Sequence, residues 1–376
     1  MILDAVEGSI LVPSLVSIAD NLEQSTFKTQ WLMSGFALGF AMLLPVGPAL
    51  AARYGRRNVY LVAMACFAVA SILGGLSGNL SVLVLTRVVK GAAAALTAPA
   101  GLAVIAEAFQ AGSQRRRAIS VYATLGAAGF TAGLLLSGLL EQVTWRLLFF
   151  LPGLVATLLL VAAWRVIPSA SAEPLKAYRV NIFRNETLVR STIGAAAING
   201  GYIALILVLA IHLYGTVGWS TWQIGLGLLP ASVPLIFSSL LTERLMAAFG
   251  SACLIFIGAS VTVAGQLLWI VQADGDNYVT DILPVLLLVE AGFVLSFAAL
   301  NTQAAAALSV SSRARGVSIY QTGVQAGAAA MLPVAVGLSA VLSSRYAAVV
   351  VLLAGMVAVV AAGMELGSGR NGRKLQ

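Results

Sequence analysis

The stretch that decides the fold is SQRRRAISVYATLGAAG at residues 113–129, because it recurs without gaps as SSRARGVSIYQTGVQAG at residues 311–327. Both copies carry Arg-x-Arg, Ser-x-Tyr-x-Thr and a final Gly at the same positions. A shorter echo pairs LAARYG at 50–55 with LMAAFG at 245–250, although Ala and Gly are common enough here for chance to produce it. Two copies that run in the same direction predict a chain built from two parallel halves.

The composition excludes most soluble functions. Of the 376 residues, 60% are hydrophobic and 10% are charged, and the mean hydropathy is +0.95. Because a soluble domain is about 25% charged, we predict an integral membrane protein rather than a soluble enzyme, a nucleic-acid-binding domain or a disordered chain. The net charge of +8 would suggest nucleic acid, but the basic residues lie between apolar runs. The single His212 excludes a His-rich metal site, and we expect no metal and no cofactor.

Apolar runs of about 20 residues can each cross a bilayer core, and they predict an all-α fold with twelve transmembrane helices. The runs lie near residues 1–19, 32–52, 59–78, 80–108, 119–140, 147–167, 192–214, 222–242, 253–272, 282–308, 318–343 and 346–364. The long polar stretch 168–190 lies almost midway and is predicted to be a linker. We therefore expect an N-terminal six-helix half at 1–167 and a C-terminal six-helix half at 191–376, which ends in a short basic tail.

Lysine and arginine set the predicted orientation. With the N-terminus in the cytoplasm, seventeen of the 22 Lys and Arg residues fall in inside segments, and only Lys28, Arg146 and Arg345 fall in outside loops. This asymmetry follows the positive-inside rule. It predicts a multi-pass protein of the cell membrane with both termini and the 168–190 linker in the cytoplasm. The alternative is a helix count that is wrong by one or two.

Several motifs resemble the major facilitator superfamily of transporters. GPALAARYGRR at 47–57 resembles the family's loop between helices 2 and 3, and the matching positions are Leu50, Arg53, Gly55, Arg56 and Arg57. RVVKGAAAA at 87–95 resembles the helix 4 motif, and GWSTWQIGLGLLP at 218–230 resembles the region of helices 7 and 8. These motifs are most similar to the drug:proton antiporter, or multidrug efflux, branch. The resemblance implies the major facilitator fold.

The chain also departs from that branch. Ala52 stands where the family loop carries an Asp, and Lys90 replaces a Gln in the helix 4 motif. In helix 5, Leu134 occupies the position of a proline, which leaves a facilitator or importer of a small solute as an alternative to an exporter. Only two residues precede Leu3, so helix 1 either begins abruptly or is truncated. The second case leaves an inactive truncated family member as a further alternative.

Five charged residues are expected to lie inside the hydrocarbon of the membrane. Asp4 and Glu7 lie in helix 1, Arg87 and Lys90 in helix 4, and Glu290 in helix 10. The resemblance implies that helices 1, 4, 7 and 10 line a central cavity. Asp4 and Glu7 are three residues apart, as are Arg87 and Lys90, so each pair shares one helix face. We expect Asp4, Glu7 and Glu290 to bind protons or a substrate cation, with Arg87 and Lys90 as counter-charges. The open alternatives are a structural salt bridge between helices 1 and 4, and a hydrated Asp4 at the helix start.

Glu290 is the strongest of these candidates. It lies about 12 Å into helix 10 at 1.5 Å per residue, which is near the bilayer midplane. The alternative is a protonated carboxyl that is bonded to a neighbour such as Ser296 or Asn199. Further candidates for the substrate cavity are Tyr202, Tyr320 and Gln325.

Small and basic residues predict the moving parts. Gly126, Gly129 and Gly133 have the small-residue spacing that permits close helix packing, and we expect a hinge there for rocking the two halves. The resemblance implies a gating role for Arg53, Gly55, Arg56 and Arg57, whose arginines would bond helix ends or acids across the two halves. Without an acid at position 52, this lock is expected to be incomplete.

Together these features predict a secondary active transporter rather than an enzyme. We expect it to export amphipathic, drug-like or antibiotic-like small molecules by alternating access, driven by the proton gradient. The expected partners are a small-molecule substrate and the lipid bilayer, with no nucleic acid, and the chain is expected to act as a monomer.

Overall fold

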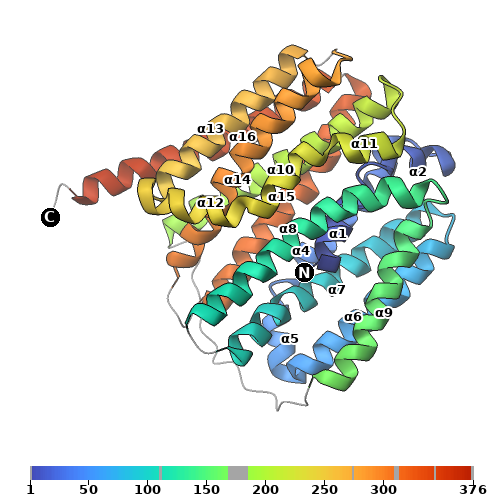
Figure 1. The fold of residues 1–376 in the computed structure, drawn as a ribbon, viewed down its shortest axis with the longest axis horizontal. Coiled ribbons are helices and arrows are strands. Elements are labelled where there is room, and N and C mark those ends of the chain that lie inside the picture. The colour runs from blue at the N-terminus through green and yellow to red at the C-terminus, as the bar shows by residue number, and fades with distance from the viewer. Residues whose placement is uncertain are drawn as a thin grey trace. The chain divides into compact units, whose positions relative to one another are not determined.

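The computed structural model describes residues 2–109, 112–167, 185–272, 275–308, 313–342 and 344–373. Every regular element in those ranges is a helix (Figure 1). The chain divides into two compact units, Met1–Ala177 with Gly218–Leu229, and Tyr178–Val217 with Pro230–Gln376. Most of the predicted linker, residues 168–184, lies outside the described residues, and residues 186–190 already belong to helix α10.

The first unit, called unit 1 below, is built around a long helix that packs between two others. Helix α7 contacts both α4 and α6, α9 packs on α6, and α1 packs on α8, which also contacts α11. The helices are α1 (Ile2–Ser9), α2 (Leu15–Asn21), α3 (Thr26–Thr29), α4 (Trp31–Leu43), α5 (Gly47–Tyr54), α6 (Arg56–Leu76), α7 (Leu80–Ala108), α8 (Ser113–Glu141), α9 (Leu147–Val166) and α11 (Thr221–Gly227).

Glycines bring α4 and α7 into backbone contact. A Cβ atom added at Gly39 would collide with the carbonyl of Val88, and one at Gly91 would collide with the carbonyl of Phe36. Small residues allow this close approach in membrane helices. The contact fixes the face of α7 that carries Arg87 and Lys90.

The second unit, unit 2, has its own helical core. Helix α14 packs on α10, α12 and α13, while α10 also packs on α15 and α16. The elements are α10 (Glu186–Gly215), the 3-10 turn η2 (Leu229–Ala231), whose first residue belongs to unit 1, α12 (Val233–Phe249), α13 (Ser251–Gln272), the π-helical turn η3 (Tyr278–Ile282), α14 (Leu283–Ala306), α15 (Arg313–Val341) and α16 (Ser344–Arg373).

The sequence repeats fall on matching structural features. The first repeat begins α8 with residues 113–129, and residues 313–327 of its second copy begin α15; each helix is 29 residues long. The second repeat ends at Gly55 in unit 1 and at Gly250 in unit 2, and each glycine joins two successive helices. Their backbone angles are nearly the same, φ 82° and ψ 143° against φ 78° and ψ 157°. Glycine adopts this conformation readily, so the shorter echo marks a shared turn.

Nine helices in the described part of the chain are long and apolar enough to cross a membrane, or ten if the bent pair α4 and α5 forms one span. The structure therefore shows a multi-span helical protein, whereas the count of twelve stays a prediction. The three predicted runs without an unbroken span are 1–19, 32–52 and 222–242. Each contains proline, which removes a backbone donor and interrupts a helix; the bend between α4 and α5 is 56°.

Candidate functional site

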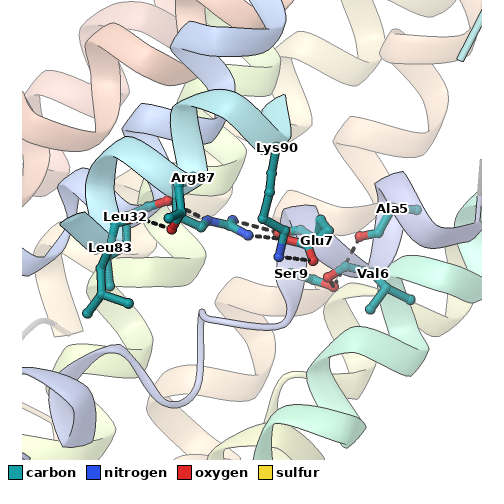
Figure 2. A network of polar contacts seen from close by, with 9 residues as sticks. Ala5, Val6, Glu7, Ser9, Leu32, Leu83, Arg87 and Lys90 are labelled. Carbon is teal, nitrogen blue, oxygen red and sulfur yellow. Dashed lines mark hydrogen bonds and ion pairs between the residues drawn. The ribbon is translucent and has the colours of Figure 1, made fainter. Parts of the chain in front are cut away.

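Glu7 lies between two cations in the interior of unit 1 (Figure 2). Arg87 Nη1 donates to Glu7 Oε2, and Lys90 Nζ lies 2.5 Å from Glu7 Oε1. The three side chains are at most 2% exposed. Helix α1 carries the acid, and α7 carries the two cations one turn apart. The structure thus brings together a predicted acid and both predicted counter-charges.

Backbone carbonyls and aromatic rings complete the surroundings of the two cations. Arg87 Nη2 donates to the Glu7 carbonyl and Arg87 Nε to the Leu32 carbonyl, both at 2.8 Å. Its guanidinium lies 4.8 Å from the centroid of the Phe36 ring. The Lys90 ammonium lies 5.0 Å from the centroid of Phe67 and 5.4 Å from that of Phe149. Aromatic faces attract cations, so the rings take the place of water.

Helix α1 is held against α8 by glycines and serines. A Cβ atom at Gly129 would lie 2.8 Å from the Ile2 carbonyl, and one at Gly133 would lie 2.8 Å from the Val6 carbonyl. Ser9 Oγ donates to the Phe130 carbonyl at 2.7 Å. The predicted glycines therefore mark the contact of α1 with α8. Gly126, one turn earlier on α8, is also buried.

Asp4 lies in α1 about one helical turn before Glu7. It is half-buried and interacts electrostatically with Glu7.

The predicted gating residues surround the turn between α5 and α6. Gly55 is buried in this turn, Arg53 and Arg56 are exposed, and Arg57 is half-buried. Arg57 Nη2 donates to the Trp164 carbonyl at 2.7 Å, in the last turn of α9, where a cation complements the helix dipole. This bond to a helix end lies within unit 1. A lock between the two halves stays a prediction.

Glu290 forms a second buried polar site, in unit 2. It lies on α14, is 1% exposed, and its Oε2 is 2.9 Å from the hydroxyl of Tyr202 on α10. The same hydroxyl donates to the carbonyl of Ala231 in η2. The backbone N–H of Leu235 also faces the carboxyl. Of the two neighbours named in the alternative reading of Glu290, Ser296 Oγ donates to the carbonyl of Gly292 and Asn199 donates to that of Val324.

An aromatic column that was not predicted from the sequence extends from this site. The rings of Tyr202 and Phe293 stack at 4.2 Å between centroids, and Phe293 stacks on Phe297 at 4.8 Å. Phe293 and Phe297 follow Glu290 on α14 at positions three and seven residues later. This spacing places them along one helix face and was the available signal.

The other two cavity candidates lie on α15. Tyr320 is buried, and its hydroxyl has no hydrogen-bond partner among the described residues. Gln325 is half-buried. The structure records no bond from either residue to Glu290, so Tyr202 alone of the three candidates joins the acid.

The comparison with known proteins agrees with this architecture. The family model described as the Major Facilitator Superfamily matches residues 1–330. The puromycin resistance protein pur8 of Streptomyces alboniger is 34% identical over 168 residues, 44% of this chain and 33% of that protein. The tetracenomycin C resistance and export protein of Streptomyces glaucescens is 33% identical over 170 residues, 45% of this chain and 31% of that protein.

A further relative is the methylenomycin A resistance protein of Bacillus subtilis, 31% identical over 170 residues, 45% of this chain and 36% of that protein. Each alignment therefore covers about a third of the relative's length. The family match spans both units. The chain belongs to the Major Facilitator Superfamily, a family of membrane transporters, and its similarity is to members that confer antibiotic resistance.

Proposed function

We propose that this chain is a secondary active transporter that exports amphipathic small molecules in exchange for protons. Its similarity to a resistance and export protein supports export. The single observation that supports proton exchange is Glu290, a carboxyl that is 1% exposed within an apolar helix and bonded to a tyrosine rather than to a cation. Ionisable groups inside a membrane are costly and commonly mark ion or substrate pathways.

The two buried acids differ in what holds their charge. Glu7 has Arg87 and Lys90 against its two carboxylate oxygens, so two cations compensate its negative charge. Glu290 has a neutral phenol and a backbone amide, so its charged form is poorly compensated. We therefore assign the proton to Glu290 and a charge-balancing role to Glu7. A proton-carrying role for Asp4 stays a prediction.

The proposed transport cycle uses the predicted membrane arrangement. Twelve spans, with breaks in 1–19, 32–52 and 222–242, would place both termini in the cytoplasm of a monomer in the cell membrane. Alternating access would then expose Glu290 to each side in turn. Gly129 and Gly133 have no side chain at the contact with α1, so α8 can slide along α1 there. No cofactor is required, because the proton gradient supplies the energy.

The test is efflux of ethidium from a transporter-deficient bacterium that expresses the chain. Wild type should lower the retained dye, an uncoupler should abolish the effect, and Glu290→Gln should match the empty vector at equal membrane abundance. The control Glu186→Gln removes an exposed carboxyl from the first turn of α10 and should leave efflux unchanged. Ethidium uptake, or efflux that an uncoupler does not affect, would contradict the proposal and would favour a facilitator or importer.

A further inference from the structure

A proline-rich break in unit 2 depends on side chains for its backbone hydrogen bonds. The turn η2 and Ser232 separate α11 from α12. Pro230 lies within the break and Pro234 in the first turn of α12, and neither has an N–H to donate. In an unbroken helix, the N–H of Leu235 would donate to the carbonyl of Ala231, four residues earlier. Here that N–H faces the Glu290 carboxyl, and that carbonyl accepts from Tyr202.

The contacts of Tyr202 at this break depend on whether Glu290 is protonated. The Tyr202 hydroxyl has a single proton, yet it contacts both the Ala231 carbonyl and Glu290 Oε2. A carbonyl and an ionised carboxylate can only accept. Both contacts can be separate, two-centre hydrogen bonds at once only when Glu290 is protonated, because Glu290 would then donate to Tyr202 and Tyr202 to Ala231. These contacts are therefore the ones expected of the proton-loaded acid.

Loss of that proton changes the contacts. The carboxylate then attracts the Tyr202 proton, since hydrogen bonds to charged acceptors are the stronger ones. Tyr202 has no second proton, so the Ala231 carbonyl loses its donor inside an apolar unit. An unsatisfied buried carbonyl is unfavourable, and the backbone at residues 229–232 is expected to move in response. Loss of the proton from Glu290 thus converts a closed backbone break into an open one.

We propose that Tyr202 is a positioning residue through which the protonation of Glu290 controls the hinge at residues 229–232. The inference rests on the proposed function only in naming Glu290 as the proton carrier. The hinge lies where the chain passes from unit 1 to unit 2, after Leu229. On one side of it, α11 packs against α8, where a Cβ atom at Gly225 would lie 2.7 Å from the Leu134 carbonyl. On the other side, α12 packs against α14, which carries Glu290.

Other titratable groups do not replace Tyr202 in this role. Helix α14 packs on α10, α12, α13, α15 and η3, and the recorded hydrogen bond of the Glu290 side chain to a titratable side chain goes to Tyr202. The remaining described titratable or charged residues on those elements are Glu186, Arg190, His212 and Tyr214 on α10, Arg244 on α12, Cys253 on α13, Tyr278 and Asp281 in η3, and Arg315 and Tyr320 on α15.

Hydrogen–deuterium exchange of the purified full chain in lipid nanodiscs tests the hinge. Exchange of the backbone amides in residues 228–237 is compared at acidic and alkaline pH, after correction for the intrinsic pH dependence, with residues 251–272 as the internal reference. In wild type, these amides should exchange roughly five- to tenfold faster when Glu290 is ionised, as expected for loss of one buried hydrogen bond.

Variants separate the hinge from a general loss of structure. Glu290→Gln keeps an acceptor for Leu235 and a donor for Tyr202, so exchange should stay slow at both pH values. Tyr202→Phe removes the donor to Ala231, so exchange should be fast at both. The control Tyr320→Phe removes a buried hydroxyl that has no partner among the described residues and should keep the pH dependence of wild type.

Two outcomes would overturn the inference: exchange in wild type that does not depend on pH, or a pH dependence in Glu290→Gln equal to that of wild type. The experiment uses no substrate and no gradient. A flat exchange profile would therefore reject the hinge while proton-coupled export stands. A pH-dependent profile in a chain without gradient-driven efflux would support the hinge and reject only the export proposal.

Discussion

Replacement of Glu7 by glutamine should strongly destabilise unit 1, because Glu7 is the buried counter-ion of Arg87 and Lys90. Glu7, Arg87 and Lys90 are at most 2% exposed, so the change leaves two cations buried without their counter-ion. Removing one partner of a buried ion pair costs about 3–5 kcal/mol. The unfolding equilibrium should therefore shift by about two to four orders of magnitude.

Removal of one of the two cations provides a control, for which no loss of stability is expected. Lys90→Met removes the excess cation, leaves the neutral pair of Arg87 with Glu7, and places a flexible apolar side chain between Phe67 and Phe149. Apolar replacement of a buried charge is often neutral or stabilising, so this variant should be at least as stable as wild type. The double variant should be less destabilised than Glu7→Gln alone.

Unfolding by sodium dodecyl sulfate in mixed micelles, followed by near-ultraviolet circular dichroism, measures these differences. Unfolding of Glu7→Gln at the same detergent fraction as wild type would contradict the role of Glu7 as the buried counter-ion. Equal instability of Lys90→Met and Glu7→Gln would also contradict this role. The two cations would then share the acid equally, and neither would be in excess.

Two further substitutions test the packing and the shared turn by the same unfolding measurement. Gly133→Val should lower stability by about 1–3 kcal/mol, because even a Cβ atom there lies 2.8 Å from the Val6 carbonyl, whereas Gly8→Ala, with open space around it, should be nearly neutral; equal effects would contradict the close contact of α1 with α8. Gly55→Ala should lower the free energy of unfolding by about 1–3 kcal/mol, because residue 55 has a positive φ angle of 82°. The control Gly215→Ala, at the end of α10 with no neighbour within 4 Å, should leave it unchanged.

Sequence patterns predicted much of the fold because they depend on local periodicity. Apolar run length placed the long helices, and the three-residue spacing of Arg87 and Lys90 placed both cations on the face that meets Glu7. The helix breaks were harder to predict, since Pro13, Pro48 and Pro230 lie within runs that read as continuous by hydropathy alone. Membrane helices tolerate proline in some contexts, so composition does not decide whether a run breaks.

The partners of Glu290 could not be predicted, because they come from distant parts of the chain. Ser296 and Asn199 were plausible partners by sequence, but each bonds to a backbone carbonyl elsewhere. Tyr202 reaches Glu290 because α10 packs on α14, which is a tertiary property. The carbonyl of Ala231 gives no sequence signal at all, since every residue has one.

The most direct test of the account is uphill transport of ethidium into proteoliposomes with an acidic lumen and a clamped membrane potential. Wild type should concentrate the dye while protons leave, and it should only equilibrate the dye when the two pH values are equal. Glu290→Gln should exchange labelled for unlabelled dye at equilibrium but should not concentrate it. Uphill accumulation by Glu290→Gln, or accumulation by wild type without a pH difference, would contradict a proton carried by Glu290.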